Sequence, residues 1–364
     1  MLEPKPTINA LVVDDSAFMR NAIRSMLESD ESIRVMATGR NGMDAIKLTQ
    51  QFQPDILTLD IEMPEMDGLT ACRQIKRLCP DTRILMVSSL TTEGSHVTLQ
   101  ALRYGADDFI AKDQSQISLD IKHIRDDLLA KVHALVESKR SGRPISKPAI
   151  AHDHHVDVKQ LLNKKPPRAI LIGSSTGGPP VLEKLITALP ERFPYPVLIA
   201  QHMPATFTAS LVERMNDMAN VPVVHVDRHM PMENGKVYLA QGGKHLRVRQ
   251  SRGEVRLEVS STPADALYKP SVNELFSSAA SVYGRRALGV MLTGMGDDGC
   301  EGARAMHAAG AQIVAQTAES CVVYGMPRAV VEAGVATAAM GIEQIGSLVS
   351  QASGCIGAGL RRTA

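Results

Sequence analysis

The sequence predicts an α/β protein with two doubly wound domains, each built on a parallel sheet. Short β-branched runs alternate with amphipathic helical stretches over residues 8–136, and a second alternation begins at residue 168. Such alternation is typical of βαβ units with helices on both faces of a sheet. The 364 residues suit two domains of roughly 150 residues each. A charged, proline-containing interval separates the two patterns.

The first region holds five candidate strands, in chain order INALVV, IRVMAT, DILTLD, RILMVS and DFIA. Helix-like stretches with one apolar face separate them, among them AFMRNAIRSMLES, GMDAIKLTQQF and GLTACRQIKRL. Because each strand candidate is followed by a helical stretch, the pattern predicts a (βα)5 domain over residues 1–136.

Residues 137–167 differ in composition from both flanks. They contain four prolines, many charged residues and little apolar periodicity, which is typical of a linker, apart from a short helical pattern near VKQLLN. The HDHH run at 152–155 could bind a metal ion. No framework of carboxylates and histidines at fixed spacing surrounds this run, so we expect a solvated linker.

The second region, residues 168–364, repeats the strand and helix alternation. Its strand candidates are AILIG, PVLIAQH, PVVHV, KVYLA, HLRVR, VRLEVS, LGVMLTG and QIVAQ. Helical patterns cover 179–189, 205–218, 271–283, 299–309 and 327–333. The closely spaced strands between 236 and 260 lack a helix between them, which predicts an antiparallel insertion in an otherwise parallel α/β domain.

Composition narrows the classes of function. A net charge of +1 gives no overall field for nucleic acid or an anionic membrane, and an aromatic content of 3% without tryptophan disfavours base stacking. The five cysteines are scattered without a CxxC pair, as in a reducing compartment. No signal peptide or spanning apolar run is apparent. We therefore expect a cytoplasmic protein that does not bind nucleic acid or insert into a membrane.

Acidic and basic residues follow the strands of the first region. Asp14 and Asp15 end the first strand, Asp60 ends the third, and Ser88 and Lys112 end the fourth and fifth. The carboxyl ends of central parallel strands meet beside the topological switch point, so we expect these side chains to lie together. Three carboxylates repel one another unless a cation lies among them, and Mg²⁺ suits oxygen ligands.

This set of strand-end residues resembles the receiver domain of bacterial response regulators, over about residues 7–130. The resemblance implies that Asp60 accepts a phosphoryl group from a histidine kinase. It also implies that Asp15, Asp60 and the carbonyl of Glu62 hold Mg²⁺, with Asp14 assisting through water.

The same resemblance implies that Ser88 and Lys112 contact the phosphoryl oxygens and that Phe109 occupies the aromatic switch position. One departure is visible, because Asp113 stands where receivers usually carry proline in a cis peptide. A cis bond before a non-proline residue costs ~2.5–4 kcal/mol. The geometry of this loop therefore does not follow from the resemblance, whereas Lys112 matches its pattern.

The GSSTGG turn at 173–178 could cradle a phosphate or present a serine nucleophile. A P-loop requires a lysine after the glycines, and a dinucleotide site requires GxGxxG with a later acid, and neither pattern is present. The turn does match G-x-S-x-G between a strand and a helix. Ser175 would then lie at a helix N-terminus, where backbone N–H groups can support a developing oxyanion.

Other strand ends supply the partners of a serine nucleophile. His202 ends the run VLIAQH, and Asp297 and Asp298 follow VMLTG. A serine hydroxyl needs a general base, and histidine provides one near neutral pH. A carboxylate would fix the tautomer of that histidine and stabilise its protonated form. The chain order of serine, histidine and aspartate differs from that of α/β-hydrolases.

The motifs IGSSTGGP, QHMP and MLTGMGDDG, after a receiver domain and a linker, resemble the chemotaxis protein-glutamate methylesterase (CheB) family over nearly the whole chain. The resemblance implies a Rossmann-like catalytic domain over 168–364. It implies Ser175 as nucleophile, His202 as general base and acid, and Asp298 as the orienting carboxylate. Thr176 and Met295 would flank the site, the backbone of Met295 serving as an oxyanion contact.

The family usually carries asparagine at the position of Asp297. Either Asp297 or Asp298 could therefore be the carboxylate beside His202. The implied reaction is hydrolysis of glutamate γ-methyl esters on the cytoplasmic helices of chemoreceptors, without a metal or cofactor at the esterase site. The same acyl chemistry permits deamidation of receptor glutamines. We also hypothesise that the unphosphorylated receiver inhibits the esterase.

Two alternatives belong to other classes of function. A response regulator with a DNA-binding output would carry a helix-turn-helix and a basic recognition face near its C-terminal end. A phosphoryl-relay adaptor would use its second domain only to bind a partner. Labelling of Ser175 by a serine-directed reagent separates that adaptor from an enzyme.

Overall fold

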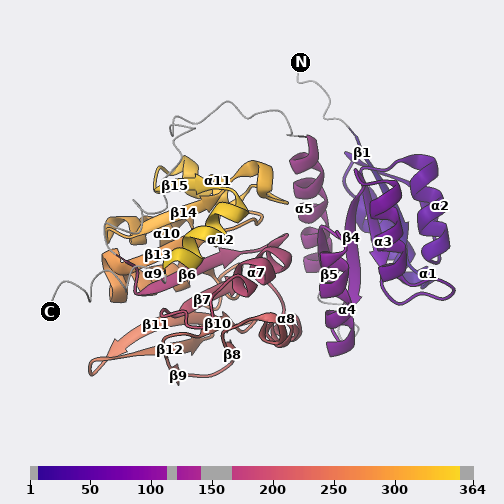
Figure 1. The fold of residues 1–364 in the computed structure, drawn as a ribbon. Coiled ribbons are helices and arrows are strands. Elements are labelled where there is room, and N and C mark those ends of the chain that lie inside the picture. Colours follow the sequence, from indigo (N-terminus) through magenta and orange to yellow (C-terminus); the bar gives the residue numbers. More distant parts are fainter. Residues whose placement is uncertain (1–6, 113–120, 141–165, 353–364) are drawn as a thin grey trace, which may run out of the picture. The chain divides into compact units, whose positions relative to one another are not determined.

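The structure, a computed structural model, describes residues 7–112, 121–140 and 166–352 (Figure 1). It divides into two compact units, Met1–Arg143 and Pro144–Ala364. Each unit is built on a parallel sheet, so the predicted α/β class is confirmed. Among the described residues, no helix is both long and apolar enough to cross a membrane.

The first unit is a five-stranded parallel sheet with the strand order β2-β1-β3-β4-β5. Helix α1 packs against α5, while α3 packs against both α2 and α4, so helices cover both faces. The order reverses between β1 and β3, which places the switch point at the carboxyl ends of these two strands. The elements are β1 (Ile8–Val13), α1 (Ala17–Glu28), β2 (Ile33–Gly39), α2 (Gly42–Phe52), β3 (Ile56–Asp60), α3 (Gly68–Leu78), β4 (Arg83–Ser89), α4 (Thr92–Arg103), β5 (Asp108–Lys112) and α5 (Ile121–Arg140).

Side-chain caps define where four of these helices begin. Ser16, Asn41, Asp67 and Thr91 each accept a hydrogen bond from the backbone N–H three residues later, at the starts of α1, α2, α3 and α4. Such a cap satisfies one of the free N–H groups of the first turn and stabilises a helix by about 1 kcal/mol. The loops that leave β1 and β3 are therefore short and well defined, which fixes the acidic residues that they carry.

Helix α5 extends to Arg140, four residues beyond the expected end of the domain at residue 136. From residue 137 the sequence is richer in charged residues than the preceding helix. The helix can nevertheless continue, because no helix breaker occurs before Gly142 and Pro144. The predicted start of the linker at residue 137 therefore falls within the last turn of α5. The HDHH run and the VKQLLN pattern both lie outside the described residues.

The second unit is a seven-stranded parallel sheet with the strand order β15-β14-β13-β6-β7-β10-β8. Helix α9 packs against α10, and α7 packs against both α8 and α12, on the two sides of the sheet (Figure 1). Strands β13, β6 and β7 are neighbours at its centre. The parallel strands and helices are β6 (Ala169–Ser174), α7 (Gly178–Thr187), β7 (Val197–Gln201), α8 (Ala205–Met218), β8 (Val223–Val226), β10 (Val237–Ala240), α9 (Val272–Tyr283), β13 (Ala287–Met291), α10 (Cys300–Ala308), β14 (Gln312–Gln316), α11 (Met326–Glu332), β15 (Ala338–Met340) and α12 (Ile342–Gln351).

The predicted antiparallel insertion is present but narrower than expected. It is a three-stranded sheet of β11 (His245–Ser251), β12 (Glu254–Ser260) and β9 (Met230–Pro231). The KVYLA segment lies elsewhere, because β10 pairs in parallel with β7 and β8 inside the main sheet. All four side chains of β10 are buried, as expected for a strand covered on both faces. Strand β15 and helix α12 are not among the elements expected from the sequence.

Candidate functional sites

Strands β6, β7 and β13 place Ser175, His202 and Asp298 at one edge of the sheet. Ser174 and Gln201 are paired across β6 and β7, and the backbone N–H of His202 donates to the carbonyl of Ser174 over 3.1 Å. Ser175 and His202 are the residues that directly follow this pair. Since neighbouring strands lie ~4.8 Å apart, these two residues leave the sheet side by side.

The turn after β6 has the geometry that a serine at a helix N-terminus requires. The backbone N–H of Ser175 donates to the carbonyl of Thr293 over 3.0 Å, and its own carbonyl accepts from Gly178 over 2.8 Å. Gly177 has a φ of 74°, and a Cβ there would lie 2.5 Å from a methyl group of Val322. Glycine is therefore required at 177, and α7 begins one residue later.

Gln201 fixes this turn, and the sequence analysis missed it. Its side chain is buried; Oε1 accepts from the hydroxyl of Ser174 over 2.6 Å, and Nε2 donates to the carbonyl of Ser175 over 2.9 Å. The two hydrogen bonds join the turn that carries Ser175 to the end of β7. A glutamine at a strand end carries no distinctive signal in a single sequence, so only the fold reveals this contact.

Asp298 is the carboxylate beside His202. Its Oδ2 lies 2.9 Å from His202 Nε2, and both side chains are only 7% exposed. The carboxylate also accepts from the Ser271 hydroxyl over 2.9 Å and from the backbone N–H groups of Val272 and Asn273, at the N-terminus of α9. Asp297, the competing acid, is exposed.

Burial opposes ionisation of Asp298, but its hydrogen bonds outweigh that effect. Burial alone would raise the pKa of the carboxyl group, whereas the hydrogen bond and charge of His202 and the two backbone N–H groups hold the pKa below its ordinary value. The positive end of the α9 dipole acts in the same direction. Asp298 therefore stays ionised near neutral pH, as an orienting carboxylate must.

The other nitrogen of the His202 ring is available for chemistry. Nδ1 is buried and has no hydrogen-bond partner among the described residues. In the tautomer that carries its proton on Nε2, that nitrogen would donate to Asp298 and the lone pair of Nδ1 would be free to accept a hydrogen bond. The ring also stacks on Tyr268, with 4.2 Å between ring centroids and an interplanar angle of 3°. The sequence analysis did not single out Tyr268.

Of the two residues predicted to flank this site, Thr176 belongs to the serine turn itself and Met295 follows β13. The backbone carbonyl of Thr176 accepts from the hydroxyl of Thr293 over 2.9 Å, and Met295 is half-buried in the loop after β13. Gly294 leaves room for Ser175, since a Cβ there would lie 2.9 Å from the Cβ of Ser175. The geometry combines an uncrowded serine with a neighbouring histidine and a buried carboxylate, which suits acyl transfer.

The first unit gathers its acidic residues as predicted. Oxygen atoms of Asp14, Asp15 and Asp60 all lie within 4.8 Å of one another. The ammonium group of Lys112 lies 2.8 Å from a carboxylate oxygen of both Asp14 and Asp60. Three carboxylates at this spacing form a donor set that fits a hard divalent cation such as Mg²⁺.

The surroundings of Asp60 disfavour the ionised form of its carboxyl group. Burial raises its pKa to about 6, although the charge and hydrogen bond of Lys112 act to lower it. Asp60 and Glu62 line a cavity of about 680 Å³ that also contains Asp15 and Lys112. A strongly perturbed carboxyl group at the edge of a cavity is typical of a functional residue.

We predict that Asp60→Asn stabilises the first unit. Above about pH 6 the folded wild type maintains a buried carboxylate, so the amide should raise the free energy of unfolding by about 1–3 kcal/mol. Below about pH 3.8 Asp60 is protonated in both states and the gain should vanish. Urea unfolding of a 1–140 fragment in EDTA measures the difference. A lower stability of the Asn variant at pH 7.5 contradicts this account.

Ser88 and Phe109 also belong to the predicted receiver site, but their surroundings differ from those of the acidic residues and Lys112. Ser88 is fully buried; its hydroxyl donates to the carbonyl of Gly94 over 3.2 Å and accepts from Thr98 over 2.7 Å. It is therefore directed to α4, and Ser89 lines the cavity instead. Phe109 is buried, and the ammonium group of Lys131 lies 5.3 Å from its ring centroid. Asp113 lies outside the described residues.

Known proteins resemble the chain over nearly its whole length. A model of the CheB methylesterase family matches residues 170–349, and a model of the response regulator receiver domain matches residues 10–122. The protein-glutamate methylesterase/protein-glutamine glutaminase 1 of Oleidesulfovibrio alaskensis is 45% identical, covering 95% of this chain and 99% of that protein. A second such enzyme, from Nitratidesulfovibrio vulgaris, is 44% identical, covering 94% and 98%.

Among solved structures, the catalytic domain of Thermotoga maritima CheB is 34% identical, with a TM-score of 0.49, covering 51% of this chain and 98% of that domain. The two family models fall on the two units of the structure, one on each. The chain therefore belongs to the CheB methylesterase family and carries a response regulator receiver domain before its esterase domain.

Proposed function

We propose that this enzyme hydrolyses glutamate γ-methyl esters on chemoreceptors with a triad of Ser175, His202 and Asp298. The observation that carries the proposal is the buried pair of His202 Nε2 and Asp298 Oδ2, 2.9 Å apart, at the strand end beside Ser175. Relatives named protein-glutamate methylesterase support the substrate class.

The arrangement implies a stepwise acyl transfer. The Ser175 oxygen attacks the ester carbonyl carbon while Nδ1 of His202 accepts the hydroxyl proton. Asp298 stabilises the imidazolium that forms. The tetrahedral intermediate then collapses, the bond to the methoxy oxygen breaks, and Nδ1 returns the proton so that methanol leaves. Water repeats the sequence on the acyl-enzyme and releases the glutamate carboxylate.

The oxyanion of the tetrahedral intermediate needs donors near Ser175. We propose the backbone N–H of Met295 as one donor, with the N-terminus of α7 adding a favourable dipole. Thr176 would flank the bound ester. No metal or cofactor takes part in this proposed sequence. The same steps on a glutamine side chain release ammonia in place of methanol, in line with the second activity in the relatives' names.

For the receiver we propose Asp60 as the residue that accepts a phosphoryl group from a histidine kinase. Asp15, Asp60 and the backbone carbonyl of Glu62 would hold Mg²⁺, with Asp14 bound through water. The cation would neutralise charge on the transferring phosphoryl group. Lys112 already bridges Asp14 and Asp60, so it can contact phosphoryl oxygens, whereas Ser88 would have to turn away from α4 first.

The proposed arrangement along the chain is a receiver over residues 1–136, a linker over 137–167 and a catalytic domain over 168–364. The substrate would be the cytoplasmic helices of chemoreceptors, which places the reaction in the cytoplasm. A DNA-binding output does not fit a C-terminal unit that belongs to a methylesterase family.

The experiment that tests this function is methanol release from a methylated receptor fragment. We expect a small-molecule phosphodonor with Mg²⁺ to raise the rate of the full-length enzyme by about tenfold, because a coupling of 1–3 kcal/mol between sites is typical. Asp60→Asn should remove the response to the phosphodonor. Methanol release that is equally fast with and without phosphodonor would show that the receiver does not control the esterase.

A further inference from the structure

Tyr268 lies against the ring of His202 and is assigned no role by the triad. The two rings are parallel to within 3°, with 4.2 Å between their centroids. The hydroxyl end of Tyr268 lies beside the loop that carries Asp298, since a Cβ at Gly296 would be 3.3 Å from the tyrosine oxygen. Tyr268 therefore touches the histidine on one side and approaches the aspartate-bearing loop on the other.

Tyr268 belongs to the segment between β12 and α9, and His245 on β11 contacts residues near both ends of that segment. His245 is 1% exposed; its Nε2 lies 3.1 Å from the carbonyl of Pro263, and its Nδ1 accepts the N–H of Ser271 over 3.3 Å. Because Nδ1 accepts, Nε2 must carry the proton and donate to Pro263. One buried ring thus joins the beginning and the end of the segment.

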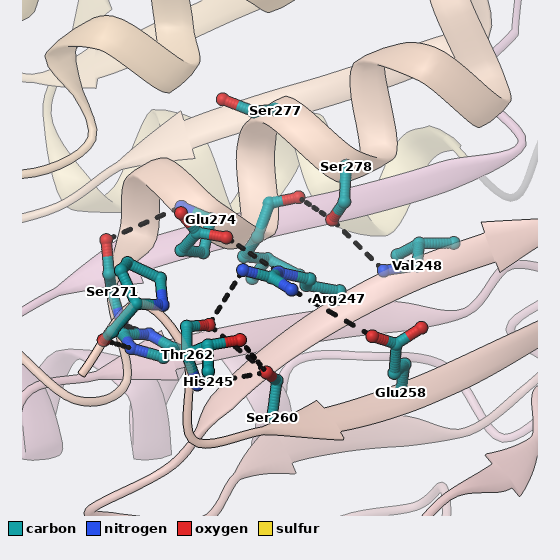
Figure 2. Close-up of polar contacts among 12 residues, drawn as sticks. His245, Arg247, Val248, Glu258, Ser260, Thr262, Ser271, Glu274, Ser277 and Ser278 are labelled. Atoms are coloured by element: carbon teal, nitrogen blue, oxygen red, sulfur yellow. Dashed lines mark hydrogen bonds and ion pairs between the residues drawn. The ribbon is translucent and has the colours of Figure 1, made fainter. Parts of the chain in front are cut away.

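Arg247 adds a second anchor at the start of the segment. It donates to the carbonyl of Thr262 over 2.7 Å and forms ion pairs with Glu274 on α9 and Glu258 on β12 (Figure 2). Ser271, at the other end, caps α9 and also donates to Asp298. The segment that carries Tyr268 is therefore fixed to the same helix N-terminus that holds the triad carboxylate.

We infer that Tyr268 is a positioning residue for His202. The stacked ring restricts the imidazole to the plane in which Nε2 meets Asp298, which leaves Nδ1 in place to accept the serine proton. The face of an aromatic ring also attracts a cation, so Tyr268 stabilises the imidazolium formed during acyl transfer. This inference rests on the proposed triad, and Tyr268 affects catalysis only through His202.

Full-length Tyr268→Leu and Tyr268→Phe, assayed with phosphodonor on a small aryl ester, test the inference. The leucine variant should lose about tenfold in kcat with KM within about twofold, because a desolvated cation–π contact is worth ~1–2 kcal/mol. The phenylalanine variant should keep kcat within about twofold. Leu267, the neighbouring residue, is 85% exposed, so Leu267→Ala is the matched control and should behave as wild type.

Full kcat in the leucine variant would overturn the inference. An equal loss in the phenylalanine variant would also overturn it, because the hydroxyl and not the ring would then matter. A similar loss of kcat in Leu267→Ala would show that the effect belongs to the loop as a whole, and this result would also overturn the inference.

Nuclear magnetic resonance gives a second measurement that does not depend on catalysis. The ring current of Tyr268 should shift the carbon-bound imidazole protons of His202 upfield, and Tyr268→Leu, but not Tyr268→Phe, should remove the shift. A His202→Gln spectrum assigns the signals. An unchanged shift in the leucine variant contradicts the stacking. If Ser175→Ala remains active, the triad itself fails; if only the Tyr268 variants depart from expectation, the triad stands and this inference fails.

Discussion

Ser175→Ala is expected to lower kcat for ester hydrolysis by at least about 10⁴-fold, because removal of a triad nucleophile leaves only the binding and oxyanion contributions. A continuous assay with a small aryl ester measures the loss. Phosphorylation of Asp60 by a small-molecule phosphodonor should be unchanged, since it takes place in the other unit. A serine-directed acylating reagent should label the wild type at Ser175 and leave the alanine variant unlabelled.

Ser174 provides the matched control for this change. Its hydroxyl is buried and donates to Gln201, so it cannot reach a substrate. Ser174→Ala should cost about 1 kcal/mol of stability, because Gln201 loses a buried hydrogen bond, and less than tenfold in kcat. If Ser174→Ala instead abolishes hydrolysis while Ser175→Ala does not, the nucleophile is assigned to the wrong serine. Absence of labelling at either residue would favour the adaptor alternative.

Asp298→Asn is expected to lower kcat by about 10³–10⁴-fold, whereas Asp297→Asn should change it by less than about threefold. The amide of the first variant can no longer stabilise the imidazolium or fix the tautomer with the lone pair on Nδ1. Asp297 is exposed and takes no part in the hydrogen bonds that link Asp298 to His202 and the start of α9. Steady-state assays of the two variants, with circular dichroism to verify folding, measure the difference.

The pair of variants also decides which acid serves the triad. A large loss in Asp297→Asn with a small loss in Asp298→Asn would reverse the assignment. Comparable losses in both would indicate that the negative charge of the loop matters and not the direct contact with His202. Only the predicted asymmetry agrees with the four hydrogen bonds that converge on the Asp298 carboxylate.

The sequence predicted most of the site because its residues follow strands. Parallel strands of one sheet direct their carboxyl ends to the same edge, so a strand-end position is a strong spatial constraint. Ser175, His202 and Asp298 satisfy it in one unit, and Asp14, Asp60 and Lys112 in the other. The two doubly wound sheets follow from the same alternation of strands and helices.

Other features depend on contacts that no local pattern encodes. Tyr268 stacks on His202 from a segment that is bound by His245 and Arg247 on β11, far from both residues in the sequence. The entry of β10 into the main sheet is decided by long-range pairing with β7 and β8. The direction of the Ser88 hydroxyl is a choice of rotamer, which the strand-end position leaves open.

The most direct test of the account is to identify the residue that carries the acyl group. The wild-type enzyme would be mixed with a receptor peptide that contains a glutamate methyl ester, quenched in acid during the first turnover, and digested for mass spectrometry. The glutamyl group should be attached through an ester to Ser175, and no such adduct should form in Ser175→Ala. An adduct on another residue, or methanol released at the wild-type rate by Ser175→Ala, would contradict it.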